Sequence, residues 1–129
     1  MDSSNVAPHQ KIAILGHVDV DPAARDEVIA SVVDLQRSTR DDEPGCLAYV
    51  IAADPVDPAR IQIVELWESA AAVDAHFQHP NFAATGAALR AAPRRGGASR
   101  KYRIDAEDDV KGPDGQASGE FWSAGDRDG

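Results

Sequence analysis

The chain has 129 residues, a hydrophobic content of 43% and a formal net charge of −9. That length suffices for one domain with a modest core. No apolar run approaches the roughly 20 residues that a membrane helix needs, and the acidic balance disfavours nucleic acid, whose binding depends on neutralising phosphates. The first residues lack the features of a secretory signal, and Cys46 is the single cysteine, so we expect a cytoplasmic protein without disulfides.

The first predicted elements are a strand and a long helix. Residues 1–9 have the composition of a flexible leader. Apolar side chains alternate along 11–20, which is typical of a strand, and Gly16 within it indicates a bulge or a close backbone approach. An aspartate suited to the N-cap is followed by a proline suited to the first helical turn, which predicts a helix over 22–40.

The rest of the chain predicts two strands, a helix in two pieces and a final strand. Ser69 stands where the N-cap of the second helix belongs. From Glu107 the composition becomes that of a flexible acidic tail, 107–129, in which Phe121-Trp122 is either an anchor for docking or an incidental aromatic pair. We expect strands at 46–53 and 60–68 and the two helix pieces at 70–78 and 81–92. A Gly- and Arg-rich loop is expected at 93–99 and the last strand at 100–106.

This order, β-α-β-β-α-α-β, predicts an α+β fold with a ferredoxin-like split antiparallel sheet. Its helices can cover only one face of the sheet. Apolar residues nevertheless occupy both parities of the second strand, so the other face must also be buried. The two sets are Leu47, Tyr49 and Ile51, and Cys46, Ala48 and Val50.

Four motifs between residues 42 and 82 resemble the antibiotic biosynthesis monooxygenase family. They are Glu-Pro-Gly-Cys at 43–46, Asp-Pro-x-Asp-Pro at 54–58, Glu-x-Trp-Glu-Ser at 65–69 and Ala-His-Phe-x-x-Pro-x-Phe at 75–82. With the flanking strands, the resemblance covers roughly Ile12 to Ile104 and implies that 10–106 form one such domain. It also implies a homodimer in which two sheets pack face to face as a dimeric α+β barrel, and a small aromatic substrate.

His76 is the candidate catalytic base, because it borders the apolar face of its helix, where its charge state suits proton abstraction, and it matches the family histidine. The alternative is a histidine that only packs and hydrogen-bonds a neighbouring backbone. Trp67 is expected either as a wall of an aromatic pocket or as a plain core side chain. Glu65 is in phase with apolar residues, so it must be paired or have a raised pKa; an interface salt bridge is the favoured explanation.

Four more residues are candidates for substrate binding. His17 interrupts an apolar strand face, the Tyr49 phenol could donate to a quinone-like oxygen, Phe82 belongs to the helix motif, and Arg90 could stabilise negative charge. Arg90 belongs to a cluster of six basic residues, which form either a solvated face or a positive rim for an anionic or phenolic ligand. They are Arg90, Arg94, Arg95, Arg100, Lys101 and Arg103.

The sequence also departs from its relatives. Asn81 stands where many family members have a second histidine, so a mechanism that needs two imidazoles is not expected. The heme-degrading branch uses a set of Asn, Trp and His residues. In this chain His76 stands at the position of that tryptophan, and the position of that histidine falls near Gly86, which cannot ligate iron; heme degradation is therefore not expected. Motifs for flavin, nicotinamide, phosphate or metal binding are absent.

The leading prediction is a cofactor-independent monooxygenase acting on a hydroquinone- or anthrone-like aromatic; the alternatives are a non-catalytic ligand-binding or stress-response module and a cofactor-free isomerase.

Overall fold

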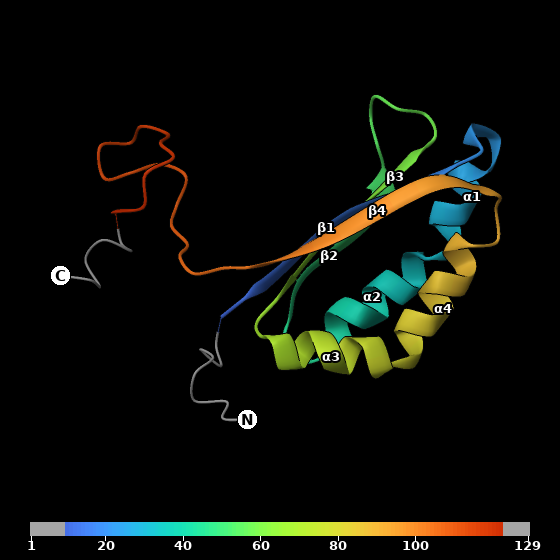
Figure 1. The fold of residues 1–129 in the computed structure, drawn as a ribbon, viewed down its shortest axis with the longest axis horizontal. Helices are drawn as coiled ribbons and strands as arrows, with labels where there is room; N and C mark the ends of the chain where they lie inside the picture. The colour runs from blue at the N-terminus through green and yellow to red at the C-terminus, as the bar shows by residue number, and fades with distance from the viewer. Residues whose placement is uncertain (1–9, 123–129) are drawn as a thin grey trace.

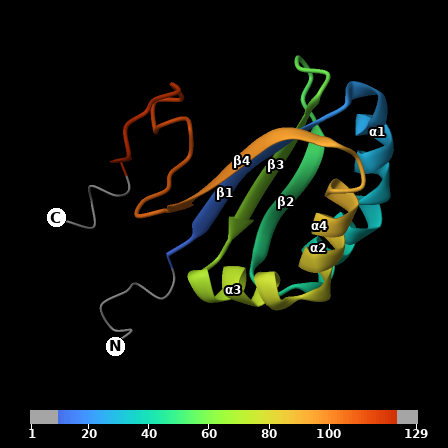
Figure 2. The same ribbon diagram turned by 45° about the vertical axis from the view of Figure 1, so that its right-hand side comes forward.

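The computed structural model describes residues 10–122; the predicted leader and the end of the predicted tail lie outside them. The elements of this part are, in chain order, β1 (Ile12–Val20), α1 (Pro22–Ser31), α2 (Val33–Asp42), β2 (Cys46–Ala53), β3 (Arg60–Trp67), α3 (Ala70–Gln78), α4 (Pro80–Leu89) and β4 (Arg94–Arg103). The strands form one antiparallel sheet in the order β2-β3-β1-β4, and the helices lie on one side of it (Figures 1 and 2). The predicted α+β, ferredoxin-like fold is therefore confirmed.

The sheet face beneath the helices carries the hydrophobic core. Because successive side chains of a strand point to opposite faces, one parity of each strand meets the helices. The buried apolar residues are Ile12, Ile14, Val18, Val20, Val28, Val32, Tyr49, Ile51, Ile61, Trp67, Val73 and Ala92. None of the helices in residues 10–122 is long and apolar enough to cross a membrane.

Within residues 10–122, no element covers the opposite face of the sheet (Figure 1). Val50, Val64 and Leu15 lie side by side on β2, β3 and β1, and all three are exposed. A row of this kind is costly to leave in water, since apolar surface is stabilised by burial. The second apolar parity predicted from the sequence thus forms a surface on the side away from the helices.

The long helix predicted over 22–40 is interrupted. α1 ends at Ser31 and α2 begins at Val33, with the buried Val32 at φ −109° and ψ 8° between them. The Ser31 hydroxyl donates to the carbonyl oxygen of Val28 at 2.6 Å. A serine that bonds back to the preceding turn competes with the helical hydrogen bonds and bends the helix, which explains the break.

The last strand begins earlier than predicted. The Gly and Arg content of 93–99 is typical of a loop, but β4 starts at Arg94 and pairs with the length of β1. A Cβ atom added to Gly16 would lie 2.7 Å from the Cβ of Ser99, which confirms the predicted close backbone approach. The expectation of a loop was wrong because the main-chain groups of β1 require partners, and that pairing outweighs the low strand propensity of glycine.

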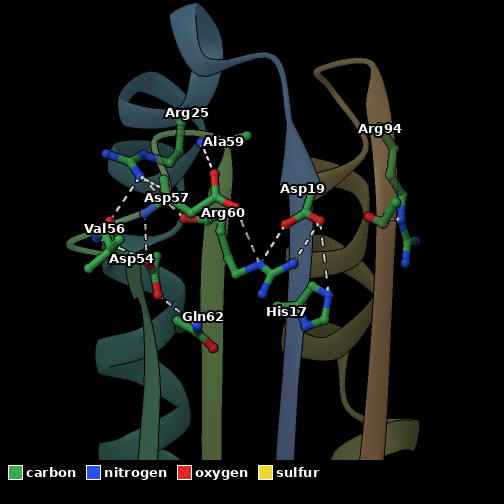
Figure 3. Close-up of polar contacts among 11 residues, drawn as sticks. His17, Asp19, Arg25, Asp54, Val56, Asp57, Ala59, Arg60, Gln62 and Arg94 are labelled. Atoms are coloured by element: carbon green, nitrogen blue, oxygen red, sulfur yellow. Dashed lines mark hydrogen bonds and ion pairs between the residues drawn. The ribbon is translucent and has the colours of Figure 1, made fainter.

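The loop between β2 and β3 is held by Arg25 and Asp54 (Figure 3). Arg25 Nη1 donates to three main-chain oxygens, at 3.1, 2.8 and 3.3 Å. The Asp54 carboxylate accepts from the N–H groups of Val56 and Asp57 and from Gln62 Nε2, and these bonds lower the pKa of Asp54 to about 2. The two predicted Asp-Pro pairs therefore lie in a loop fastened by polar contacts rather than by apolar packing.

Residues 104–122 leave the sheet and form a turn with hydrogen bonds of its own (Figures 1 and 2). An ion pair of 2.6 Å between Lys11 and Glu107 joins this segment to the domain. Phe121 is half exposed, and the ring of Trp122 lies near Gly112 of the same segment. Anchoring of the two aromatics on a second subunit stays a prediction.

Gly45→Ala is expected to lower the free energy of unfolding by about 2–4 kcal/mol, combining a left-handed backbone with overpacking. Gly45 joins α2 to β2 at φ +86°, and a Cβ there would lie 2.6 Å from the Cβ of Ala72. Gly115→Ala is the matched control, because Gly115 has a φ of +79° but open space around its Cβ. Urea unfolding measures both, and an equal, small loss in the two variants would contradict the packing argument.

Candidate active site

His76 lies at the centre of a buried cluster beneath α3. The helix begins at Ser69, whose hydroxyl accepts from the N–H of Ala72, and this register turns Val73 and His76 toward the sheet. The His76 side chain is only 1% exposed. Four aromatic rings surround it, with centroid distances of 4.7 Å to Trp67, 5.5 Å to Tyr49, 5.4 Å to Phe82 and 5.8 Å to Phe77.

Glu43, from the connection between α2 and β2, holds one side of this imidazole. Glu43 Oε1 lies 2.7 Å from His76 Nδ1, and both side chains are buried. The other carboxylate oxygen, Oε2, accepts from Asn81 Nδ2 at 3.0 Å. Since a carboxylate can only accept hydrogen bonds, Nδ1 of the imidazole carries the hydrogen in this contact. In the neutral form of the ring, the lone pair is then on Nε2.

His76 Nε2 is buried and has no hydrogen-bond partner among residues 10–122. An unpartnered polar atom in the interior costs about 1–3 kcal/mol, so such atoms are uncommon and point to function. The hydroxyl of Thr85, on α4, is also buried, and it lies beside the phenol of Tyr49. A carboxylate on one nitrogen and an unused lone pair on the other are the arrangement that a general base requires.

Glu65 and Tyr49 lie on adjacent strands beside Trp67. The indole Nε1 of Trp67 donates to Glu65 Oε1 at 2.9 Å. Burial raises the pKa of Glu65, and burial together with the charge of Glu65 raises the pKa of Tyr49, so its phenol stays neutral and able to donate. The favoured explanation of Glu65 as an interface salt bridge was wrong: its side chain faces the helices, and the indole of Trp67 is its partner.

Phe77 and Phe82 form the outer cover of the imidazole. They come from α3 and α4, their ring centroids are 4.9 Å apart, and their side chains are 40% and 44% exposed. Both rings also contact His76. Displacement of these two partly exposed side chains is therefore a short route from solvent to the base.

The structure brings together most of the residues predicted for the site. Trp67, Tyr49, Glu65 and Phe82 gather around His76, as described above. His17 does not, because it lies on the uncovered face of the sheet, 4.0 Å from Asp19 (Figure 3). Arg90 follows the last turn of α4 and is exposed, with its guanidinium near Gly86.

Two functional candidates were missed by sequence reasoning. Glu43 was interpreted only as part of the Glu-Pro-Gly-Cys motif, and Asn81 only as the replacement of a family histidine. The signal available for both was that they fall within two of the family motifs, at 43–46 and 75–82. Within residues 10–122, no group of three or more His, Cys, Asp or Glu side chains is placed to hold a metal ion.

The family model for antibiotic biosynthesis monooxygenases matches residues 11–88. The chain belongs to this family. The family resemblance predicted from the motifs is therefore confirmed, and it spans every element from β1 through most of α4.

Solved structures agree in fold. A proposed antibiotic biosynthesis monooxygenase of Caulobacter crescentus shares 27% identity over 81% of this chain and 97% of its own, with a TM-score of 0.66. A second one, from Deinococcus radiodurans, is 21% identical over 78% of this chain and 99% of its own, with a TM-score of 0.69, and supports the fold alone. The uncharacterized protein sll1783 of Synechocystis is 34% identical over 71 residues, which are 55% of this chain and about half (48%) of that relative.

Glu65→Gln is expected to stabilise the protein at pH 8 and to lose this advantage at pH 4. The pKa of Glu65 is raised in the folded state, so the native protein loses stability as pH rises through that pKa and the buried group becomes charged. Glutamine carries no charge at either pH and can still accept from the Trp67 indole. Urea unfolding at the two pH values measures the difference; a variant that is less stable than the native chain at pH 8 would contradict the burial argument.

Proposed function

We propose that this protein is a cofactor-independent monooxygenase that oxidises an electron-rich aromatic, such as a hydroquinone or an anthrone, with molecular oxygen. The observation that carries the proposal is the buried Glu43–His76 pair, in which Nδ1 is held by a carboxylate and Nε2 is left without a partner. Membership of the family supports the reaction class. The aromatic cluster around the imidazole suits a flat ring as substrate.

In this mechanism His76 Nε2 removes a proton from a phenol or from an activated carbon of the substrate. Glu43 stabilises the imidazolium through Nδ1–H, while the electron-rich anion reacts directly with O2. One oxygen atom forms a new bond to the substrate carbon and the other leaves as water. For an anthrone the change is CH2 plus O2 to C=O plus H2O, so the substrate supplies all the electrons.

The surrounding side chains favour this chemistry. Tyr49, neutral because burial raises its pKa, is a donor for negative charge that develops on a substrate oxygen. Trp67 forms a flat wall at 4.7 Å from the imidazole, and the apolar cluster excludes water that would protonate the anion. The substrate reaches Nε2 when Phe77 or Phe82 turns aside.

The functional unit in this proposal is a homodimer formed through the uncovered sheet face. The row of Val50, Val64 and Leu15 on that face supports sheet-to-sheet packing with a second copy, since a two-fold axis would place the same apolar row opposite itself. The Glu43–His76 pair lies on the other side of the sheet, within one chain. Each subunit would therefore hold a complete base.

An oxygen electrode with a panel of hydroquinones and anthrones tests the reaction. His76→Ala is expected to lower kcat by about 10²–10⁴-fold, the usual contribution of a general base. Gln78→Ala, an exposed change on the same helix, is the control and should retain full activity. Conversion of the panel without oxygen would indicate an isomerase instead, and binding without any conversion would indicate a ligand-binding module.

A further inference from the structure

A cleft of about 370 Å³ lies between α3 and the paired ends of β1 and β4. Its helix wall is formed by Ala70, Val73, Asp74 and Phe77, whose spacing of three, one and three residues places them on one face of α3. Figures 1 and 2 place α3 beside the start of β1 and the end of β4. The volume lies within the range of small-molecule sites, roughly 300–1,000 Å³.

The strand wall of this cleft is positively charged. Lys101 and Arg103 occupy alternate positions of β4, so both side chains belong to the face of the sheet that meets the helices, and Ile12 lies beside them on β1. Neither cation forms an ion pair with any residue of 10–122. In a chain of net charge −9, two adjacent cations without a carboxylate partner are available to an anionic ligand.

The opposite wall offers a different polar group. Asp74, on α3, also has no ion pair in the described part of the chain, and it lines the same cleft. The same cleft is lined by the apolar side chains of Ile12, Val73 and Phe77. A carboxylate at Asp74 repels an anion but accepts a hydrogen bond from a hydroxyl group. The complementary ligand is therefore an anion at one end, apolar in the middle and a hydroxyl donor at the other.

We propose that this cleft binds a hydroxylated aromatic carboxylic acid. Lys101 and Arg103 bind its carboxylate, Asp74 accepts from its hydroxyl, and its ring packs on Ile12, Val73 and Phe77. That the bound acid is the oxygenase substrate rests on the proposed function. Phe77 supports this link, because it lines the cleft and its ring centroid is 5.8 Å from that of His76. A turn of Phe77 would bring the bound ring next to the base.

Binding of 6-hydroxy-2-naphthoate, measured by calorimetry and by amide shifts in NMR under argon, tests the site without turnover. The acid and the hydroxyl of this probe are at opposite ends of the ring system. We expect it to bind roughly tenfold more tightly than 2-naphthol, which lacks the carboxylate, and more tightly than 2-naphthoate, which lacks the hydroxyl. The amide shifts should map to α3 and to the end of β4.

Three variants assign the contacts. Lys101→Gln combined with Arg103→Gln should reduce the affinity for the probe to that for 2-naphthol, and Asp74→Ala, which removes the acceptor, should remove the preference over 2-naphthoate. Arg37→Gln, an exposed change on α2, is the charge control and should leave the Kd unchanged. Equal binding of 2-naphthol and the probe, or an unchanged Kd in the double variant, would overturn the proposal.

Oxygen uptake separates this proposal from the proposed function. His76→Ala should bind the probe as the native protein does, since His76 does not line the cleft. Specific binding by the native protein that is weakened in the double variant, with no oxygen uptake on any hydroxyaryl acid, supports the site and contradicts the oxygenase. Oxygen uptake on hydroquinones that is insensitive to the double variant and to the carboxylate supports the oxygenase and overturns the cleft as its substrate site.

Discussion

Glu43→Gln is expected to lower kcat for oxygen uptake roughly 10²-fold, with a smaller change in KM. The carboxylate of Glu43 accepts from His76 Nδ1 and from Asn81 Nδ2 at the same time. A glutamine amide offers one oxygen and one NH2 group, so it cannot accept from both. When the glutamine oxygen faces Asn81, its NH2 group donates to Nδ1 of His76. The ring hydrogen then resides on Nε2, so Nε2 no longer has a lone pair that can accept a proton from the substrate. With its oxygen toward His76, two NH2 groups face each other.

The tautomer of His76 provides a measurement independent of rate. Imidazole ¹⁵N shifts should place the hydrogen on Nδ1 in the native protein and on Nε2, or on a mixture of the two nitrogens, in Glu43→Gln. Asp41→Asn is the matched control, because Asp41 is an exposed acid in the last turn of α2. An unchanged tautomer together with an unchanged kcat would show that Glu43 only packs beside His76.

The fold was predictable from the sequence because its junctions are marked by local chemistry. The aspartate before Pro22 and the hydroxyl of Ser69 start helices where the structure has them, and Gly45 stands at the left-handed turn into β2. The errors arose where tertiary contacts outweigh composition. Residues 93–99 have poor strand propensity, but the edge of β1 pairs with them; one serine hydroxyl breaks the long first helix.

The site was predictable only in part. His76, Trp67 and Tyr49 carry side chains whose chemistry attracts notice in any sequence. Glu43 does not, since it contacts a residue 33 positions later and no periodicity relates the two. The same limit explains Glu65: its apolar phase correctly indicated burial and a raised pKa, but its partner was the indole two residues along the strand, not a charge across an interface. Pairings that depend on the crossing of helices and strands follow from the fold alone.

Val64→Glu is expected to convert the proposed dimer into a monomer. Val64 lies on the uncovered sheet face between Val50 and Leu15, and it is 41% exposed in the single chain. In a symmetric sheet-to-sheet interface the substitution would bury two carboxylates in an apolar surface, close to one another and without partners. Burying an unpaired charge costs several kcal/mol, which is a large fraction of the free energy of a typical dimer.

Light scattering at micromolar concentration measures this change. The native chain should have about twice its mass of 13.7 kDa, and Val64→Glu should have the mass of one chain. Val56→Glu is the matched control, because Val56 lies in the β2–β3 loop and is 88% exposed, so the same substitution there should leave the dimer intact. The hydrogen-bonded pair of Glu43 and His76 lies within one subunit. The monomeric variant should therefore keep the native tautomer of His76. A native chain that is monomeric at this concentration, or a Val64→Glu variant that remains dimeric, would show that the exposed row serves another purpose.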